Sequence, residues 1–409
     1  MRVLLAPEGS RGDVQPLVAL GATLAARGCQ VRVCAYPEAR ELAEPHGLEF
    51  VTHGTDTRAM IEQQAEAIHG GWLAFQRAVN PLFDEMLESQ FTHLTEAARD
   101  VDLIIGGGVQ FGGPSIAEAL GVPYRFVAYC PILFPSSEHP PFMVERQIRT
   151  PWLNRGLWRV FVATLGAQIR RGLNRHRAAL GLDPIRDVFA SLCGDEPLLA
   201  ADPDLAPGPR DGPIAYQQVG FLHPPDAGDR LPEKLEAFLA AGPPPLYIGF
   251  GSMPDPQPER TTQHLLEVIA ASGARAVISS GWAGLGAGPL TDDVLVVGTV
   301  PHAKLFPRVA AVVHHGGAGT TSSAARAGAP QVLVPHLLDQ FYFARRVREL
   351  GIGVATEARR GLDFATLSEC IDAVLENEVL AERADALGQR MRARDPHGAA
   401  ADRLLCTHH

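Results

Sequence analysis

The sequence is poor in lysine, in patterned cysteine and in positive charge. Lys234 and Lys304 are the only lysines among the 36 Lys and Arg residues, so almost every basic side chain is an arginine. The formal net charge of -10 argues against bulk nucleic-acid binding, because displacing counterions from phosphates needs a basic surface. The 6 cysteines have no CxxC spacing, which excludes a zinc knuckle or a disulfide framework as a motif and predicts buried free thiols.

Long apolar runs are also missing. The opening stretch MRVLLAPEGS has too short an apolar run for a signal peptide, and no uninterrupted stretch is long enough to span a bilayer. We therefore expect a cytoplasmic protein. With 46% hydrophobic and 20% charged residues, the 409-residue chain has the composition of a soluble globular protein of two or three domains.

Strand and helix patterns alternate in two series along the chain. In the first series, apolar strand patterns at 2–6 and 30–35 flank a helical pattern at 16–27, and a long helical stretch follows at 57–98. Strand, helix and strand in this order imply a right-handed crossover and a parallel sheet. A second series of the same kind begins near residue 246. The fold class predicted is α/β, with two doubly wound parallel-sheet domains.

Composition places the domain boundaries. Residues 222–245 are rich in proline around one short helical segment and predict a linker. We therefore expect an N-terminal domain over 1–221 and a C-terminal domain over 246–385. The last part, 386–409, is expected to form one helix from about 386 to 405 that packs back on the first domain.

A glycine-rich turn in the second series predicts an anion site. In VVHHGGAGTTSSAARAGAP (312–330), an apolar strand runs into glycines and then into a small-residue helix. Ligands of doubly wound sheets bind beyond the carboxyl ends of strands, where unpaired N–H groups at a helix start favour phosphate. Neither a P-loop motif nor the GxGxxG spacing of a nicotinamide site is present. His314, His315 and the LLDQ segment (337–340) add groups suited to a diphosphate flanked by a polyhydroxyl group.

Four stretches carry a resemblance to a known family. Residues 300–340 resemble the donor-binding signature of GT-B nucleotide-sugar-dependent glycosyltransferases of the family 1 type. GSRGDVQPLVALGATLAARG (9–28) is similar to the acceptor-side signature of their bacterial glycopeptide and sterol branch. With GFGSM (249–253) and FARRVRELGIG (343–353), the resemblance covers both predicted domains. It implies the GT-B fold, in which two Rossmann-like domains face a cleft, with the acceptor bound by the first and the donor by the second.

The resemblance assigns the donor phosphates to two turns. It implies that His315 contacts a donor phosphate and that Gly317, Gly319 and Thr320 hold the diphosphate through backbone and hydroxyl groups. Ser252, in the first turn of the second domain, is implied as a further phosphate contact.

The rest of the donor is assigned in the same way. Val300 is implied to pair with the pyrimidine through its backbone, and Asp339 and Gln340 match the pair that bonds the sugar hydroxyls. The plant branch of the family has a base-stacking tryptophan where this chain has Thr299. Trp282 is the candidate to replace it.

Asp13 is the expected catalytic base. It lies in the turn after the first strand, where the family's base is found, and a carboxylate there takes the proton from an acceptor hydroxyl as it attacks the anomeric carbon. Direct displacement implies inversion at that carbon. The alternative is that Asp13 only caps a helix starting near Pro16.

Two further features leave alternatives open. DPD (202–204) matches the DxD string that binds divalent metal in another glycosyltransferase fold, but it lies in a proline-rich loop, and we expect neither a metal nor another cofactor. The segment 145–177 is rich in arginine, above apolar residues at near-helical spacing that include Val160 and Phe161. It is either a membrane-facing or anionic-acceptor surface or the solvated face of an ordinary amphipathic helix.

The function predicted is an inverting glycosyltransferase that moves a hexose or deoxyhexose from a UDP- or dTDP-sugar to a hydroxyl of a natural-product acceptor. A sterol or lipid glucosyltransferase using UDP-glucose is the first alternative. A GT-B epimerase and a non-catalytic nucleotide-sugar-binding protein are the others. Phosphorylase chemistry is disfavoured because neither lysine lies at a suitable site for anchoring its cofactor.

Overall fold

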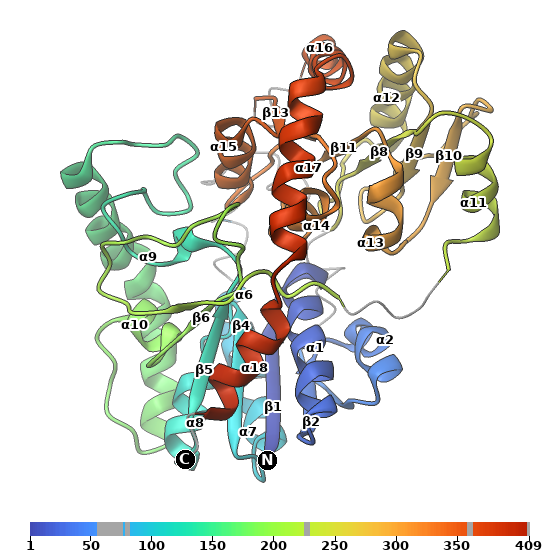
Figure 1. The fold of residues 1–409 in the computed structure, drawn as a ribbon. Coiled ribbons are helices and arrows are strands. Elements are labelled where there is room, and N and C mark those ends of the chain that lie inside the picture. Colours follow the sequence, from blue (N-terminus) through green and yellow to red (C-terminus); the bar gives the residue numbers. More distant parts are fainter. Residues whose placement is uncertain (55–76, 78–81, 225–229, 358–362, 407–409) are drawn as a thin grey trace.

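The computed structural model contains two parallel sheets, each covered by helices on both faces (Figure 1). The first sheet has the order β3-β2-β1-β4-β5-β6-β7 and the second the order β10-β9-β8-β11-β12-β13. All of the strand pairs are parallel, so the predicted α/β fold with two doubly wound domains is confirmed. The structure describes residues 1–54, 77, 82–224, 230–357 and 363–406.

The central strand of the first sheet, β1, is apolar in its middle and charged at its two ends. Val3, Leu4, Leu5 and Ala6 of β1 are all fully buried, because helices cover both faces of the sheet. Its strands are β1 (Arg2–Glu8), β2 (Gln30–Ala35), β3 (Glu49–Thr52), β4 (Leu103–Gly108), β5 (Tyr124–Ala128), β6 (Leu198–Leu199) and β7 (Gln217–Gln218). The helices of this domain are α1 (Arg11–Ala26), η1 (Pro37–Ala39), α2 (Arg40–Ala43), η2 (Glu44–His46), α6 (Leu82–Ser89), η3 (Gln90–Leu94), α7 (Thr95–Ala97), α8 (Gly113–Leu120), η4 (Pro131–Leu133), α9 (Pro151–Ala179) and α10 (Val188–Cys193).

Two predicted helices of this domain differ from the structure. The helix expected at 16–27 begins five residues earlier, at Arg11, because Ser10 caps its N-terminus. Of the helix expected at 57–98, the part that the structure describes is helical from 82 to 97, and most of the remainder lies outside the described residues.

The second sheet repeats the pattern with shorter strands. They are β8 (Leu246–Gly249), β9 (Ala276–Ser279), β10 (Val294–Val297), β11 (Ala311–His314), β12 (Gln331–Leu333) and β13 (Gly353–Ala355). The helices that accompany it are α11 (Glu233–Ala240), α12 (Pro258–Ser272), α13 (His302–Leu305), η5 (Phe306–Arg308), α14 (Ala318–Ala327), α15 (Gln340–Leu350), α16 (Phe364–Leu375) and α17 (Glu378–Arg392). The last helix, α18 (Pro396–Cys406), lies on the N-terminal domain.

The arginine-rich segment forms the long helix α9, which lies on the N-terminal domain. Its buried face consists of Trp158, Phe161, Leu165, Ile169 and Leu173. The expectation that Val160 lies on this face is wrong, since 60% of that side chain is exposed. Residues three or four positions apart share a face of a helix, whereas residues two positions apart do not. Val160 follows Trp158 by two positions and therefore points away from the buried face. None of the helices that the structure describes is long and apolar enough to cross a membrane.

The C-terminal segment is two helices instead of the single helix expected over 386–405. α17 packs against α14 in the C-terminal domain, and α18 packs against α1 in the N-terminal domain. The break at residues 393–395 lets the chain change direction as it crosses between the domains (Figure 1). On α18, Asp402 pairs with Arg27, the residue that follows α1.

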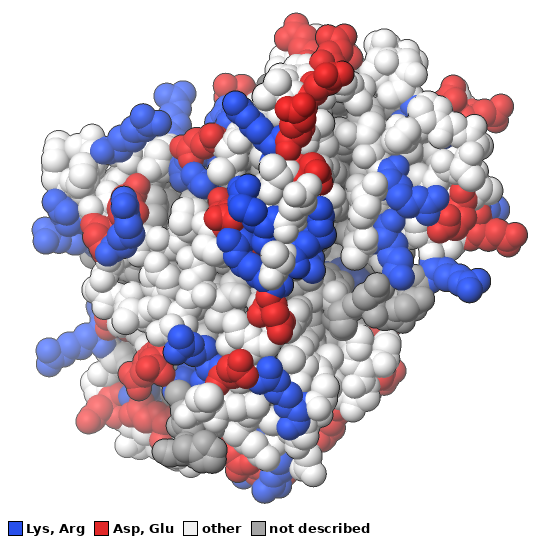
Figure 2. Space-filling view, in the orientation of Figure 1, with Lys and Arg blue, Asp and Glu red and all other residues white. Residues whose placement is uncertain are grey.

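The DPD string lies beside this crossing. Asp202 accepts hydrogen bonds from Arg394, with a closest distance of 3.0 Å, and Asp204 accepts from Arg394 at 2.7 Å and from Arg390 at 3.1 Å. Figure 2 shows basic side chains gathered in the middle of the face, in the region where Figure 1 places the lower end of α17. Both acidic side chains of the string therefore hold the two domains together through ion pairs.

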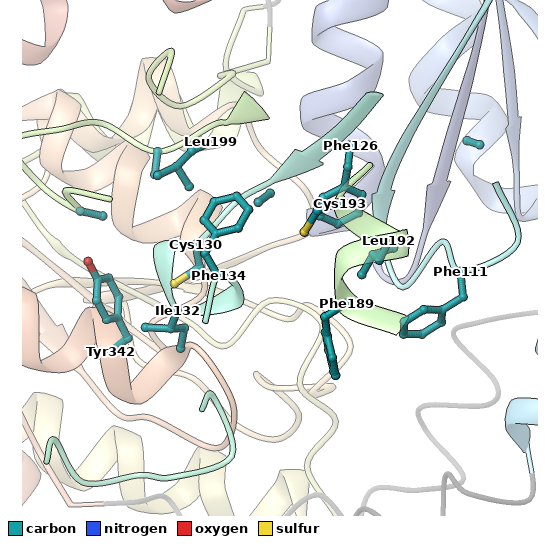
Figure 3. Close-up of a cluster of buried hydrophobic side chains, with 14 of the residues drawn as sticks. Phe111, Phe126, Cys130, Ile132, Phe134, Phe189, Leu192, Cys193, Leu199 and Tyr342 are labelled. Atoms are coloured by element: carbon teal, nitrogen blue, oxygen red, sulfur yellow. The ribbon is translucent and has the colours of Figure 1, made fainter. Parts of the chain in front are cut away.

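Apolar packing also crosses the domain boundary. Tyr342 of α15 belongs to the same buried cluster as Cys130, Ile132 and Phe134 of the N-terminal domain (Figure 3). Burying these side chains stabilises the contact between the domains by about 25 cal/mol for each Å² of apolar surface removed from water. The beginning of α15 is thereby fixed against the loop that follows β5.

Candidate active site

Both sheets have a point at which the strand order reverses. In the first sheet it lies between β1 and β4, where Glu8 is opposite Gly108. In the second it lies between β8 and β11, where Gly249 is opposite His314. Ligands of open α/β sheets bind outside the carboxyl ends of the strands at such points. The sequence-predicted residues Asp13, Ser252 and His315 follow directly on these strand ends.

Asp13 is the third residue of α1 and forms a reciprocal cap with Ser10. Its carboxylate accepts from the Ser10 backbone N–H at 2.8 Å and from the Ser10 hydroxyl at 3.2 Å. The Ser10 hydroxyl accepts in turn from the N–H of Gly12 at 3.3 Å. Asp13 is therefore part of the helix cap without being its N-cap residue. Burial raises the pKa of Asp13 to about 6, against the opposing effect of the Ser10 hydrogen bonds.

The backbone around Asp13 leaves its carboxylate little freedom. Gly9 has a φ of 140°, and a Cβ there would lie 2.3 Å from Asp13 Oδ2, so only glycine fits. The Tyr129 hydroxyl donates to the Asp13 carbonyl at 2.8 Å, which ties this turn to the strand next to β4. Helix cap, glycine and tyrosine together hold the carboxylate at the edge of the sheet.

Glu8 is a second carboxylate at this edge that the sequence reasoning missed. It ends β1 and accepts from Gln90 Nε2 at 3.2 Å, and its Oε2 lies 3.5 Å from Nε2 of His53. Burial raises the pKa of Glu8 to about 8 and lowers that of His53 to about 4, so both groups are mostly neutral at pH 7. The sequence feature that could have identified Glu8 is an acidic residue at the end of an apolar strand pattern.

The two adjacent histidines of the glycine-rich turn have different environments. His314 Nε2 donates to Gln331 Oε1 at 2.9 Å, and its Nδ1 accepts from the N–H of Gly316 at 3.1 Å. Both nitrogens of His314 are therefore used inside the domain. His315 Nδ1 has no partner among the residues that the structure describes. Burial, with smaller effects of His314 and His302, lowers the pKa of His315 to about 3, so its imidazole is neutral.

The start of α14 has the free donors that an anion site needs. Gly317 is the N-cap residue and supplies no side-chain cap, so the first N–H groups of the helix are not satisfied locally. A Cβ on Gly317 would lie 2.5 Å from His315 Nε2, which lets the imidazole lie against the helix start. The Thr321 hydroxyl is used in a bond to Gly317 O at 2.8 Å, whereas Thr320 and Gly319 are partly exposed at the turn.

The other expected nucleotide contacts surround this turn. Ser252 is partly buried in the loop between β8 and α12. The carbonyl of the preceding residue, Gly251, accepts from the backbone N–H of Trp282 at 3.0 Å. Trp282 is therefore anchored beside the Ser252 loop. The Val300 side chain is 7% exposed and packs in a core cluster, which leaves only its backbone for a ligand.

The expected sugar-binding pair divides into two roles. Gln340 Oε1 accepts from the backbone N–H groups of His336 at 2.7 Å and Leu337 at 3.2 Å, so this side chain shapes the loop before α15. Asp339 is partly exposed, and burial raises its pKa to about 7. The charge of Asp13 is the second cause of that rise, which means that the carboxyl edges of the two sheets face each other.

The described residues contain no group of three or more His, Cys, Asp or Glu side chains that could hold a metal ion. The chemistry that they bring together is a buried carboxylate on one edge and an N–H-rich turn with a neutral imidazole on the other. This combination accepts a proton on one side and negative charge on the other.

Comparisons with known proteins show the family of this chain. The family model for the N-terminal domain of glycosyltransferase family 28 matches residues 3–132, and that for the C-terminal domain of the erythromycin biosynthesis protein CIII-like family matches residues 264–404. Glycosyltransferase GtfE of Amycolatopsis orientalis is 39% identical over 99% of this chain and 97% of its own length. The vancomycin aglycone glucosyltransferase of the same organism has the same identity and coverage. Its dTDP-epi-vancosaminyltransferase is 36% identical over 93% of this chain and 91% of its own length.

Solved structures show the same fold. The calicheamicin glycosyltransferase CalG4 superposes with a TM-score of 0.72 at 20% identity, covering 99% of this chain and 97% of that one. The glycosyltransferase VinC in complex with dTDP has a TM-score of 0.69 at 21% identity, with 98% of both chains covered. From these matches and the paired sheet edges, we conclude that the chain belongs to the GT-B fold, family 1 type glycosyltransferases and is an enzyme of that class.

Proposed function

We propose that the protein is an inverting glycosyltransferase that transfers a hexose or deoxyhexose from a UDP- or dTDP-sugar to a hydroxyl of a natural-product acceptor. One observation carries this proposal: Asp13, held at the edge of the first sheet, lies within electrostatic range of Asp339 at the edge of the second. A base and a sugar-contacting residue facing each other across a cleft suit direct transfer between two bound substrates.

Asp13 serves as the general base. As the acceptor oxygen attacks the anomeric carbon, its proton passes to the Asp13 carboxylate, and the bond from that carbon to the nucleoside diphosphate breaks on the opposite face. A single displacement of this kind inverts the anomeric centre. A carboxyl whose pKa is about 6 is mostly ionised at pH 7 and still close enough to the working pH to be an efficient proton acceptor.

The departing diphosphate is stabilised by the turn after β11. The N–H groups at the start of α14 and the neutral imidazole of His315 donate hydrogen bonds to its oxygens, and the Thr320 and Ser252 hydroxyls add to them. A helix start fixed before the reaction does not need to reorganise as charge develops. We propose that this turn takes the place of a metal ion.

The donor and acceptor classes follow from the relatives. One relative is a glucosyltransferase acting on the vancomycin aglycone, another a dTDP-epi-vancosaminyltransferase, and VinC was solved with dTDP. We extend from them a pyrimidine diphosphate sugar as donor and a natural-product hydroxyl as acceptor. In this arrangement Val300 pairs with the base through its backbone, and Trp282 stacks on it.

Calorimetric titration of the protein with UDP, dTDP, UDP-glucose and dTDP-glucose, without metal and then with magnesium, tests the donor side. We expect micromolar binding of one series without metal, since the helix start supplies the electrostatics. Absence of binding by all four ligands would contradict the proposal, and binding only with magnesium would contradict the metal-free turn. For any acceptor that turns over, proton NMR of the product should show inversion of the anomeric centre.

A further inference from the structure

A cavity of about 580 Å³ lies between the two domains, next to the site described above. One wall is the loop that leads from η4 to α9, and the other is the first part of α15. Leu338, the residue before Asp339, lines it. The volume lies within the range of about 300–1,000 Å³ that is usual for small-molecule sites.

The wall on the C-terminal domain is held in an unusual conformation. Leu338 has a φ of 56°, in the left-handed region that branched apolar residues rarely adopt. Such conformations persist where the surrounding structure enforces them, and they concentrate at ligand sites. The enforcing contacts are present, because Gln340 Oε1 accepts from the backbone N–H of Leu337, next to Leu338.

The lining carries an excess of positive charge. Arg146, Arg345 and Arg348 line the cavity together with Glu145 and Glu357. Arg345 is fixed by a hydrogen bond to Gln147 and by its position 5.0 Å from the centre of the Tyr342 ring. Arg146 and Arg348 are exposed, and neither has an ion-pair partner among the described residues.

His139, which lines the same cavity, has a buried acceptor nitrogen. His139 is 5% exposed, and its Nδ1 lies 3.1 Å from Pro140 O, which places the ring proton on Nδ1 and a lone pair on Nε2. His139 Nε2 is buried without a partner in the described part of the chain. The ring lies edge-on to Trp158, whose Nε1 donates to the His139 carbonyl at 3.1 Å. A buried acceptor left unpaired is destabilising, so a ligand that donates to it is favoured.

We propose that this cavity holds a carboxylate-bearing part of the acceptor, with the carboxylate on Arg146 and Arg348 and a neighbouring N–H or O–H group donating to His139 Nε2. The inference rests on the proposed function, because it places the acceptor beside Asp339 and names its chemistry. The planar guanidinium fork matches a carboxylate with two parallel hydrogen bonds. Arg345, already bound to Gln147, keeps the wall in place.

The test compares two probes that differ only in charge, N-acetyltyrosine and N-acetyltyrosinamide. Both have a phenol and an amide N–H, and only the first has a carboxylate. Their binding is measured by calorimetry on the full chain saturated with the nucleoside diphosphate that binds it. We expect the carboxylate probe to bind about tenfold more tightly than the amide. In the R146Q/R348Q double variant this preference should disappear, while Arg155→Gln, on an exposed arginine outside the cavity lining, should retain it.

Several outcomes would overturn the inference. Equal binding of the two probes, or binding of neither, removes the carboxylate site. Loss of nucleotide affinity in R146Q/R348Q would instead assign these arginines to the donor. Nucleotide binding that persists while the probe preference is absent leaves the proposed function intact, whereas failure of the nucleotide to bind contradicts the proposed function itself.

Discussion

The carboxyl edges of the two sheets have the same topology and opposite chemistry. At the edge of the first sheet, Glu8 and Asp13 are carboxylates whose pKa values burial raises to about 8 and about 6. At the edge of the second, His315 is an imidazole whose pKa burial lowers to about 3. Burial disfavours the charged form of either type of group. The same physical effect therefore gives one edge a proton acceptor near neutrality and the other an uncharged hydrogen-bond donor.

The comparison also separates structural from functional polar groups. Ser10 makes its hydrogen bonds within its own turn, at 2.8–3.3 Å, and both ring nitrogens of His314 are used inside its domain, on Gln331 of β12 and on Gly316, at 2.9–3.1 Å. Each lies next to a polar group that keeps unused hydrogen-bonding atoms: Asp13 near Ser10, and His315 next to His314. At each edge one polar residue holds the backbone in place, and the neighbouring one is the residue that we propose contacts the ligand.

The largest effect is expected from Asp13→Asn. The asparagine keeps the size of the side chain but cannot take the acceptor's proton, so turnover should fall about 10²–10⁴-fold. Affinity for the nucleoside diphosphate should stay within twofold, because the second edge is unchanged. The measurement is steady-state transfer together with a calorimetric titration. Turnover near that of the parent would show that Asp13 serves only in the cap with Ser10.

An intermediate effect is expected from His315→Ala, with His314→Ala as its matched control. Removing the His315 donor should weaken nucleotide binding by about 10-fold, the equivalent of roughly 1.4 kcal/mol. Removing His314 leaves Gln331 Oε1 and the Gly316 N–H without their partners, so its main effect should be a lower Tm. Equal nucleotide affinity of His315→Ala and the parent would reject the role of this imidazole.

The smallest effect on turnover is expected from Glu8→Gln, which should act mainly on stability. The pKa of Glu8 is raised in the folded state, so its contribution to stability is present at low pH and is lost as pH rises through about 8. The neutral glutamine does not ionise and keeps an oxygen for Gln90 Nε2. The variant should therefore be more stable than the parent at pH 8, by on the order of 2 kcal/mol, with little difference at pH 5.

Thermal melting of both proteins at pH 5 and pH 8 measures this effect. A Tm difference that does not change between the two pH values would contradict a raised pKa at Glu8. The first edge would then contain one titrating carboxylate near neutrality, Asp13, instead of two.

Much of the fold, and part of the candidate site, could be predicted from the sequence alone. The alternation of apolar strand patterns with helical patterns predicted two doubly wound domains, and the HHGGAGTT turn indicated an anion site because glycines before a small-residue helix expose its N–H groups. The start of α1 was misplaced by five residues, because the capping interaction between Ser10 and Asp13 begins the helix at Arg11, before the expected start near Pro16. The C-terminal helix was expected to be continuous, but Pro396 begins a separate helix, α18, because proline lacks the N–H that would continue the hydrogen bonds of the preceding helix.

By itself, the sequence determined which segments become buried strands, which turns bear glycine, and which residue types stand at each strand end. These are local properties, fixed by side-chain size, polarity and spacing. Only the tertiary structure decided that Asp13 and Asp339 lie within electrostatic range, that His314 is satisfied while His315 is not, and that Arg146 and Arg348 line one cavity. These depend on how two sheets face each other, and burial, which sets the pKa values, exists only once distant segments have packed together.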